Sequence, residues 1–248
     1  IQSMLKTKRR RLFFDIETSY CIGKFWRPGS KVFISSDNII KHASIICICY
    51  KWEGEKEIYS LDWGLNKQDD KSQLVKFIKV ANQADEIVGH NGDKFDLPWV
   101  RTRCLLHKIE VFPKYKTIDT LKISRSKFRF PDNKLNTIAK YLGIGTKLRT
   151  ESGLWDRVIM DKDTKALDHM IKYCKQDVVL LEKVYNELQK QTEPKTHYGV
   201  VFGYDRTSCP ECGCEDHIKV RVSVSSSGLR KRQLKCKECH KHFTITVR

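Results

Sequence analysis

The sequence predicts a mixed α/β fold, in which a sheet is flanked by helices, followed by a small β module. Three observations predict this architecture. Short apolar segments typical of strands occupy the first part of the chain, helical and extended segments then alternate, and five of the ten cysteines crowd into residues 209–239. At 248 residues the chain is long enough for one well-packed domain and a small appendage.

The strands of the predicted sheet begin near the N-terminus. Residues 11–17 form a short apolar run, which predicts a buried strand. Residues 44–52 and 57–61 are the next predicted strands, and Gly54 between them indicates an antiparallel meander. Residues 86–88 form another short strand that ends in the turn-forming sequence Gly-His-Asn-Gly.

Helices are predicted where apolar residues recur at a spacing of three and four positions. Residues 164–191 form the longest such pattern, and its apolar stripe is typical of ordinary core packing. The predicted helix at 134–141 ends before Gly143, as expected of a helix C-cap. The remaining predicted helices cover 72–81, 96–107 and 119–124, and residues 111–118 are expected to be extended.

Composition divides the chain into a main domain over residues 4–191, a linker over 192–207 and a β module over 208–248. The linker range holds one proline, two glycines and no sustained periodicity. A module of about 40 residues is too small for an ordinary hydrophobic core, so we expect a bound metal or another cross-link to stabilise it.

The charge balance indicates a polyanionic partner. The formal net charge is +17, and nucleic acid is the commonest intracellular polyanion; a lysine-rich surface kept for solubility is the alternative. The longest apolar stretch, 44–50, is too short to cross a bilayer, so we expect no membrane association. The basic start of the chain lacks a signal-peptide core, and we expect a cytoplasmic, reducing location in which the scattered cysteines are small core residues.

Four carboxylates from distant parts of the chain form the candidate catalytic site. Asp15 and Glu17 lie two apart in a predicted strand, so both project from one face and repel unless a cation neutralises them. Asp96 begins a predicted helix, and Tyr173 and Asp177 lie four apart on the face of another. Taken singly, Asp96 is a common helix cap and Tyr173 a common packing residue. Together, such carboxylates can hold two divalent metal ions for phosphodiester hydrolysis.

The blocks around these residues resemble the three motifs of the DEDD exonucleases, in the tyrosine-bearing branch of the ribonuclease H-like superfamily. Residues 15–18 (Asp-Ile-Glu-Thr) look like the first motif, residues 91–96 have the Asn-x-x-x-Phe-Asp form of the second, and residues 173–177 have the Tyr-x-x-x-Asp form of the third. The three motifs are most similar to those of the proofreading domains of family B DNA polymerases and of the stand-alone exonucleases that resemble these domains. The resemblance covers about residues 10–190, and a cysteine-rich module rather than a polymerase body follows in this sequence.

This resemblance implies a ribonuclease H-like mixed sheet and a two-metal mechanism. One Mg²⁺ or Mn²⁺ ion would be held by Asp15, Glu17 and Asp177, and a second by Asp15 and, through water, by Asp96. Tyr173 would hydrogen-bond the attacking water. An all-oxygen site suits Mg²⁺ or Mn²⁺ better than zinc.

The same resemblance places three further residues near the terminal nucleotide: Thr18, Asn91 and Phe95. It implies a 3′–5′ exonuclease acting on DNA, with single-stranded ends preferred and the protein a monomer by default. Hydrolysis of RNA, a structure-specific endonuclease and a nucleic-acid-binding protein without catalysis stay open as alternatives, although the intact set of acids argues against the last.

The C-terminal cysteines have the spacing of a zinc site. Two Cys-x-x-Cys pairs are separated by 23 residues, and each pair can place two thiolates on one ion to complete a tetrahedron. The intervening residues predict two strands, 217–224 and 229–235, joined by a turn at 225–228. The segment resembles a zinc ribbon, and the resemblance assigns one structural Zn²⁺ to Cys209, Cys212, Cys236 and Cys239.

The rest of the module leaves two questions open. Cys214, His217, His240 and His242 are alternative ligands, and a disulfide-linked or free-thiol segment is the alternative to a metal site. Basic side chains along the predicted hairpin suit a phosphate backbone, although zinc ribbons also dock proteins.

Overall fold

The computed structural model describes residues 9–27, 29, 34–111 and 115–247. Its centre is a five-stranded sheet with the order β5-β4-β1-β6-β7. Strands β1 (Arg11–Thr18), β4 (Ile45–Trp52) and β5 (Tyr59–Asp62) form the antiparallel meander expected from the sequence. Strands β6 (Glu86–Gly89) and β7 (Lys116–Asp119) extend the sheet in parallel on the other side of β1. The predicted mixed α/β architecture is confirmed.

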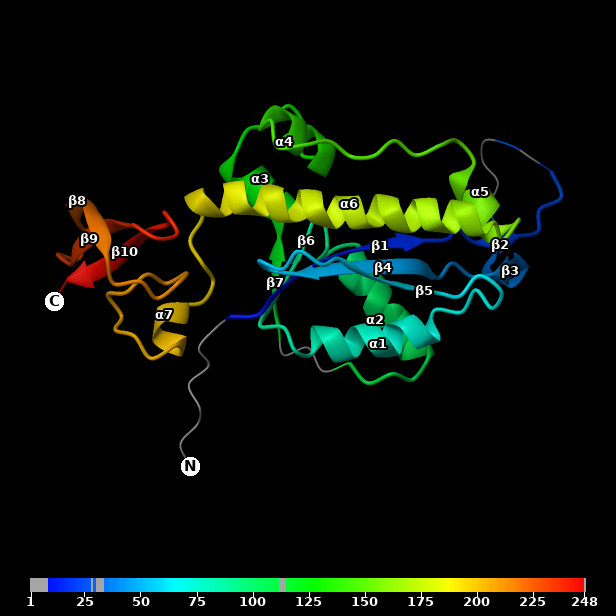
Figure 1. Cartoon of the computed structure of the whole chain (residues 1–248), viewed down its shortest axis with the longest axis horizontal. Coiled ribbons are helices and arrows are strands. Elements are labelled where there is room, and N and C mark those ends of the chain that lie inside the picture. Colours follow the sequence, from blue (N-terminus) through cyan, green and yellow to red (C-terminus); the bar gives the residue numbers. More distant parts are fainter. Residues whose placement is uncertain (1–8, 28, 30–33, 112–114, 248) are drawn as a thin grey trace.

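Helices cover both faces of this sheet (Figure 1). The long helix α6 (Thr164–Leu188) lies along one face, and α3, α4 and α5 pack against it. Helices α1 and α2 cover the opposite face. The bounds of these shorter helices are α1 (Lys71–Ala81), α2 (Asp96–Leu106), α3 (Thr120–Lys127), α4 (Leu135–Tyr141) and α5 (Leu154–Ile159).

The alternation of side chains along β1 decides which residues face which helices. Leu12, Phe14 and Ile16 are buried in the core beneath α1 and α2. Phe13 is buried in the other core, beneath α6. Asp15 and Glu17 share the parity of Phe13, so the strand directs both carboxylates to the α6 side.

Several elements were not expected from the sequence. Helix α5 spans six residues and follows Gly153, whose φ of +76° lies in the left-handed region that suits glycine. A hairpin of β2 (Ile22–Gly23) and β3 (Ile39–Lys41), with the 3-10 turn Ser36–Asn38, lies between β1 and β4. These elements are too short for a hydrophobic periodicity to reveal them.

Other expected boundaries moved slightly. Helix α6 ends at Leu188, and the last expected residues form the 3-10 turn Gln189–Gln191. Of the segment 111–118, residues 112–114 lie outside the described residues, and β7 begins at Lys116. None of the described helices is long and apolar enough to span a membrane.

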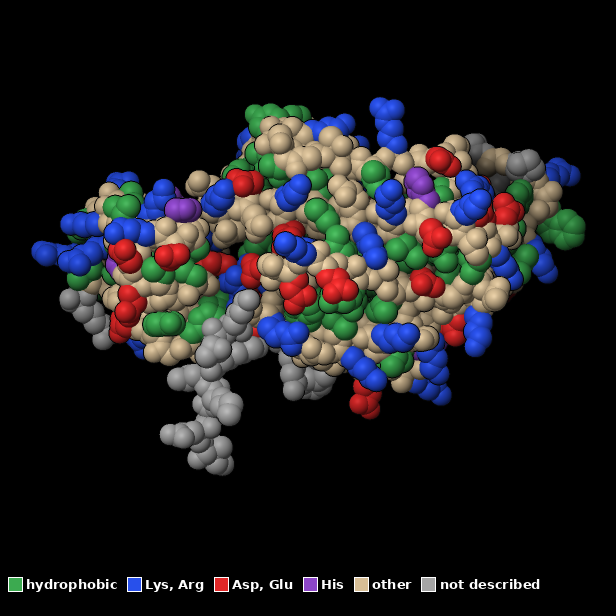
Figure 2. All heavy atoms as spheres, viewed as in Figure 1, with side chains coloured by type: hydrophobic (Ala, Val, Ile, Leu, Met, Phe, Trp, Pro, Cys, Tyr) green, Lys and Arg blue, Asp and Glu red, His purple; other side chains and the backbone are tan. Residues whose placement is uncertain are grey.

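The C-terminal module is a three-stranded antiparallel sheet in the order β10-β9-β8. Strands β8 (His217–Val224) and β9 (Arg230–Cys236) are the expected hairpin, whereas β10 (His242–Val247) was not expected. The core of the module is small and consists of Cys209, Leu234, Cys236 and Phe243. Lys and Arg side chains project from this end of the molecule (Figure 2).

The segment between the main sheet and this module contains helix α7 (Tyr198–Val201). Tyr198 is 5% exposed, and its backbone N–H donates to the carbonyl of Pro210 at 2.8 Å. Lys195 donates from Nζ to the carbonyl of Thr117 at 2.7 Å. The segment therefore contacts both the module and the main sheet.

A buried ion network joins the module to β1. Arg11 contacts Glu86 at 2.5 Å and Glu211 at 3.1 Å, and the side chains of Arg11 and Glu86 are each 2% exposed. Arg9 contacts Glu211 at 2.6 Å. Burial by itself would raise the pKa of Glu211, but the charges of the two arginines hold it below its ordinary value. Because Glu211 lies inside the first Cys-x-x-Cys pair, the module is fixed to β1 at its own cysteine turn.

We expect Glu211→Gln to lower the free energy of unfolding by about 1–3 kcal/mol, because it removes one buried carboxylate from two arginines that keep only Glu53 and Glu86 as partners. Glu215→Gln is the matched control, since Glu215 is an exposed acid four residues away. Urea unfolding of both variants measures the difference. Equal stability of the two variants would mean that the network does not hold the module in place.

Candidate active site and cysteine cluster

The described residues bring the four predicted carboxylates to one region beneath α6. β1 supplies Asp15 and Glu17, the first residue of α2 is Asp96, and α6 supplies Asp177. The backbone N–H of Ile16 donates to Oδ1 of Asp96 at 3.3 Å, which ties the start of α2 to β1. Asp96 and Asp177 are nearly inaccessible to solvent, whereas Asp15 and Glu17 keep partial solvent contact.

The electrostatics of this cluster favour neutralisation. Burial raises the pKa of Asp15 well above its ordinary value, and the charges of Asp96, Glu17 and Asp177 raise it further. Burial, with the charge of Asp177, raises the pKa of Glu17 to about 8. Burial also raises the pKa of Asp96 to about 7. In the absence of a cation the folded protein therefore retains protons on groups that are normally ionised at neutral pH.

Lys147 is a member of the site that sequence reasoning missed. Its Nζ donates to Oδ2 of Asp177 at 2.5 Å and to the hydroxyl of Tyr173 at 3.3 Å. Burial by itself would lower the pKa of Lys147, but the charge of Asp177 raises it above its ordinary value. The backbone N–H of Lys147 donates to Oδ1 of Asn136 at 2.9 Å, which holds the segment in place. Lys147 lies outside any helix or strand, so no periodic pattern marks it.

Tyr173 lies one helical turn before Asp177 on α6, as its spacing predicted. Burial, together with the neighbouring Asp177 charge, raises the pKa of Tyr173 to about 12. Its hydroxyl therefore keeps its proton at neutral pH and can hydrogen-bond a water or a phosphate oxygen.

The donor set fits hard divalent cations. The four acids offer carboxylate oxygens, the ligands that Mg²⁺ and Mn²⁺ prefer. Oδ1 of Asp177 is buried and has no hydrogen-bond partner among the described residues. The nearest soft atom is Sγ of Cys174, which lies 3.8 Å from Oδ2 of Asp15 and donates to its carbonyl oxygen at 3.5 Å. Oδ1 of Asp177 is thus a buried acceptor without a donor in the described part of the chain, and it lies among acids with raised pKa values. Both observations fit a divalent cation at this position.

The three residues expected near the terminal nucleotide are distributed around this cluster. Thr18 ends β1, and its carbonyl accepts from Nε1 of Trp155 at 3.0 Å. Asn91 has a φ of +69° in the turn before α2. Phe95 is 41% exposed and packs edge-on against Trp99.

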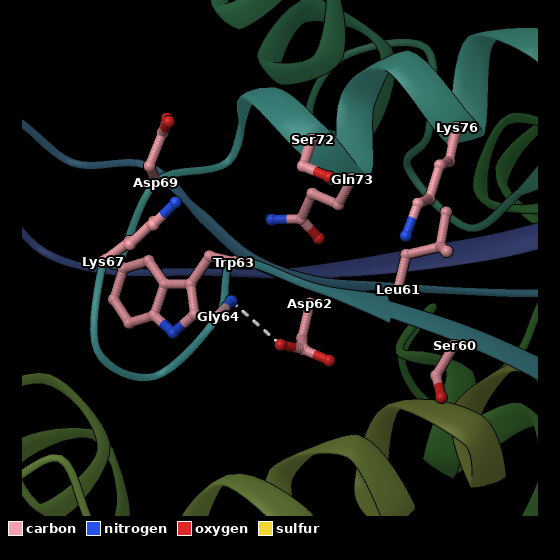
Figure 3. Close-up of a pocket in the computed structure, with 10 residues that line it drawn as sticks. All are labelled: Ser60, Leu61, Asp62, Trp63, Gly64, Lys67, Asp69, Ser72, Gln73 and Lys76. Atoms are coloured by element: carbon pink, nitrogen blue, oxygen red, sulfur yellow. Dashed lines mark hydrogen bonds between the residues drawn. The ribbon is translucent and has the colours of Figure 1, made fainter.

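A pocket of about 680 Å³ adjoins the cluster. Its lining includes Asn91 and Lys147, so one predicted residue and the missed lysine share it. Arg125, Asn133 and Lys134 add further positive charge and amide groups. By contrast, the pocket of about 420 Å³ in Figure 3, between β5 and the start of α1, contains none of the predicted catalytic residues.

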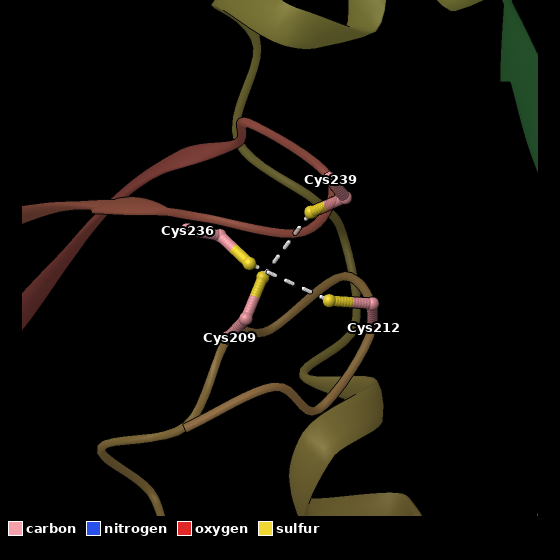
Figure 4. A group of neighbouring side chains, drawn as sticks. All are labelled: Cys209, Cys212, Cys236 and Cys239. Atoms are coloured by element: carbon pink, nitrogen blue, oxygen red, sulfur yellow. Dashed lines mark hydrogen bonds between the residues drawn. The ribbon is translucent and has the colours of Figure 1, made fainter. Parts of the chain in front are cut away.

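The four expected cysteines meet at one point (Figure 4). Their Sγ atoms all lie within 4.8 Å of one another, with 3.6 Å from Cys209 to Cys239 and 3.6 Å from Cys212 to Cys236. Four sulfurs on a tetrahedral zinc ion at about 2.3 Å lie roughly 3.8 Å apart, so the cluster fits Zn²⁺. A hydrogen bond with Cys239 lowers the pKa of Cys209, which favours its thiolate form, whereas the pKa values of Cys212, Cys236 and Cys239 are raised.

The alternative ligands lie outside this group of four. Sγ of Cys214 instead accepts from the backbone N–H of Asp216 at 3.3 Å. The His217 ring packs edge-on against Phe243, and His240 is exposed. His242 pairs with Lys235 in the sheet.

Comparison with known proteins identifies the fold family. The RNase_H superfamily model matches residues 40–189, which is more than half of the chain. The chain belongs to the RNase_H superfamily. Members of this superfamily are generally nucleases, and a nuclease fold implies a nucleic-acid substrate. The matched range contains Asp96, Tyr173 and Asp177 and begins after β1.

Among solved structures, the family B DNA polymerase of the hyperthermophilic archaeon Pyrobaculum calidifontis is similar, with a TM-score of 0.56 and 15% sequence identity. The match covers 73% of this chain and 24% of the polymerase chain, so this chain spans about a quarter of that protein. At this identity the likeness shows the fold alone. No curated protein matches the sequence.

The raised pKa values predict how stability depends on pH in the metal-free protein. Acids whose pKa is higher in the folded than in the unfolded state stabilise the fold fully below the unfolded value, and this contribution is lost as pH rises. For Glu17 that window runs from 4.5 to about 8. We therefore expect metal-free protein to lose stability across this interval, and Mg²⁺ to restore it at about pH 8.

Thermal unfolding at several pH values, with and without Mg²⁺, measures this effect. The difference between wild type and Glu17→Gln isolates the cluster from histidines that titrate in the same range. Identical pH profiles for the two proteins would contradict the assignment of the raised pKa.

Proposed function

We propose that this protein is a metal-dependent 3′–5′ exonuclease of the tyrosine-bearing DEDD type that hydrolyses phosphodiester bonds of DNA, with single-stranded ends preferred. The observation that carries the proposal is the meeting of four carboxylates from β1, α2 and α6, one of which has a buried unpaired oxygen. Membership of the RNase_H superfamily supports nuclease chemistry. The three sequence motifs support the exonuclease type and its direction.

Asp15, Glu17, Asp96 and Asp177 would hold two Mg²⁺ or Mn²⁺ ions, which supply an activated water and stabilise the leaving oxygen when bound. Tyr173, protonated at neutral pH, would orient the attacking water through its hydroxyl. The Lys147 ammonium, which reaches both Asp177 and Tyr173, would balance the charge of the scissile phosphate.

The pocket shared by Asn91 and Lys147 supports a nucleic-acid substrate. Arg125 and Lys134 on its wall suit phosphates, and the amide groups of Asn91 and Asn133 suit bases or sugars. Its volume of about 680 Å³ suits a ligand larger than a single phosphate. DNA rather than RNA is proposed from the resemblance, and RNA is an outcome of the test.

We also propose that residues 208–248 form a zinc ribbon that aids nucleic-acid binding, joined to the catalytic domain (4–191) through 192–207. The cysteine geometry supports Zn²⁺. Exposed cations along β8 and β9 support a phosphate-backbone contact; they are Lys219, Arg221, Arg230, Lys231 and Arg232.

End-labelled single-stranded DNA, duplex DNA and RNA, digested side by side with Mg²⁺, test the activity. We expect single-nucleotide shortening from the 3′ end of single-stranded DNA. Asp15→Ala or Asp177→Ala should abolish cleavage, and Tyr173→Phe should lower the rate by about ten- to a thousand-fold because it removes the group that orients water. Asp168→Ala, which removes an exposed acid of α6, is the matched control. Activity within a few-fold of wild type in Asp177→Ala would reject the proposed site.

Metal analysis tests the ribbon. We expect one zinc per chain in wild type, loss of that zinc in Cys236→Ser, and full retention in Cys214→Ser, whose thiol lies outside the cluster. The loss should be accompanied by unfolding of the module, because its core depends on the cysteines. Purified protein without zinc, or equal zinc content in both variants, would contradict the assignment.

A further inference from the structure

The segment between β1 and β4 presents two adjacent aromatic side chains to solvent. Trp26 is 101% exposed and Phe25 is 58% exposed. Single exposed apolar residues are common on protein surfaces. An adjacent pair that includes a completely exposed tryptophan adds little to the core, and exposed apolar surface of this kind is typical of a binding contact.

The sequence that contains this pair carries charge of a single sign. Lys24 and Arg27 flank the two rings, and residues 18–36 contain no Asp or Glu. Cations beside exposed aromatic rings match a single-stranded nucleic acid, whose phosphates are anionic and whose bases stack on aromatic faces. The protein's net charge of +17 acts in the same direction.

The base of the segment is fixed although its tip is exposed. Tyr20 donates from its hydroxyl to Oδ1 of Asp156 at 2.6 Å. The backbone N–H of Lys24 donates to the carbonyl of Asn38 at 2.8 Å, next to the pairing of β2 with β3. These contacts hold the two rings out on a defined support, which reduces the entropy that a stacking contact would cost.

The tip lies within reach of a strand bound at the carboxylate cluster. Trp26 follows Thr18, at the end of the catalytic strand, by eight residues, which span at most about 28 Å. Figure 1 shows the β2–β3 hairpin beside α5 at the start of α6, with the C-terminal module at the opposite end of that helix. The cluster lies between them, because Asp177 is in the middle part of α6.

We propose that Phe25 and Trp26 form a stacking platform for the bases of a single-stranded substrate whose end occupies the carboxylate cluster, with Lys24 and Arg27 contacting the flanking phosphates. The platform rests on the proposed nuclease function and extends it from the cleaved end to the strand behind it. Because every base has a π-face, the platform holds the strand without reading its sequence.

Equilibrium binding of a fluorescein-labelled oligothymidylate of about 20 nucleotides, with Ca²⁺ in place of Mg²⁺ so that no product forms, tests the platform. We expect Trp26→Ala to weaken binding about ten-fold or more, and Trp26→Phe to stay within a few-fold of wild type because an aromatic face remains. Leu105→Ala is the matched control, since Leu105 is an 81% exposed apolar residue on α2. It should bind as wild type does.

Two further readouts locate the contact. We expect a trinucleotide to occupy the cluster without reaching the tip, so wild type and Trp26→Ala should bind it equally. Quenching of intrinsic tryptophan fluorescence by the longer strand should be strongly reduced in Trp26→Phe, although its affinity is retained.

The outcomes separate this proposal from the proposed function. Unchanged binding of the long strand by Trp26→Ala overturns the platform, whether or not the protein cleaves DNA, and leaves the rings to a protein or membrane partner. Equal weakening of trinucleotide binding also overturns it, because the defect would then lie in the cluster or in the fold. Failure of wild type to cleave any substrate, with the Trp26→Ala binding defect intact, rejects the nuclease and keeps the platform.

Discussion

The repulsion among four enclosed carboxylates is the constraint on which the rest of this molecule depends. Asp15 and Glu17 project from one face of β1, while Asp96 and Asp177 approach from two helices. The pKa of each is raised because burial opposes ionisation, and neighbouring negative charges raise it further at Asp15, Glu17 and Asp96. Repulsion in this cluster destabilises the metal-free fold. Bound divalent cations would neutralise the acids, and the same cations would serve the proposed hydrolysis.

One face of β1 links this cluster to the C-terminal module. Arg11, Phe13, Asp15 and Glu17 all lie on that face. Arg11 pairs with Glu211 of the cysteine turn and stacks its guanidinium over Tyr185 of α6 at 4.6 Å. Phe13 packs against the same tyrosine. The C-terminal module and the four acids are therefore anchored to one strand and one helix.

The sequence was sufficient where local pattern and tertiary structure agree. The apolar runs of β1 and β4 and the stripe of α6 were predicted because each buries a long apolar surface, and Gly54 marked the turn to β5. The three motifs located the acids that the fold brings together. The roles assigned to those acids remain proposals, because their positions alone do not measure catalysis.

Other features depend on contacts between distant residues. Lys147 reaches Asp177 from a segment without regular structure, and Arg11 meets Glu211 across 200 positions of sequence. Strand β10 and helix α7 are stabilised by the cysteine turns that they contact, and helix α5 by the α6 core, rather than by their own periodicity. The exposure of Trp26 also depends on the tertiary structure and has no signal in the sequence.

The central claim is that the cluster is a site for two divalent cations. Titration of metal-free protein with Mn²⁺, followed by electron paramagnetic resonance of the free ion, counts them directly. We expect wild type to bind two Mn²⁺ per chain at neutral pH and to release protons as they bind. Asp15→Ala should lose at least one of the two ions. Equal Mn²⁺ binding by wild type and Asp15→Ala, or no binding by wild type, would contradict the claim.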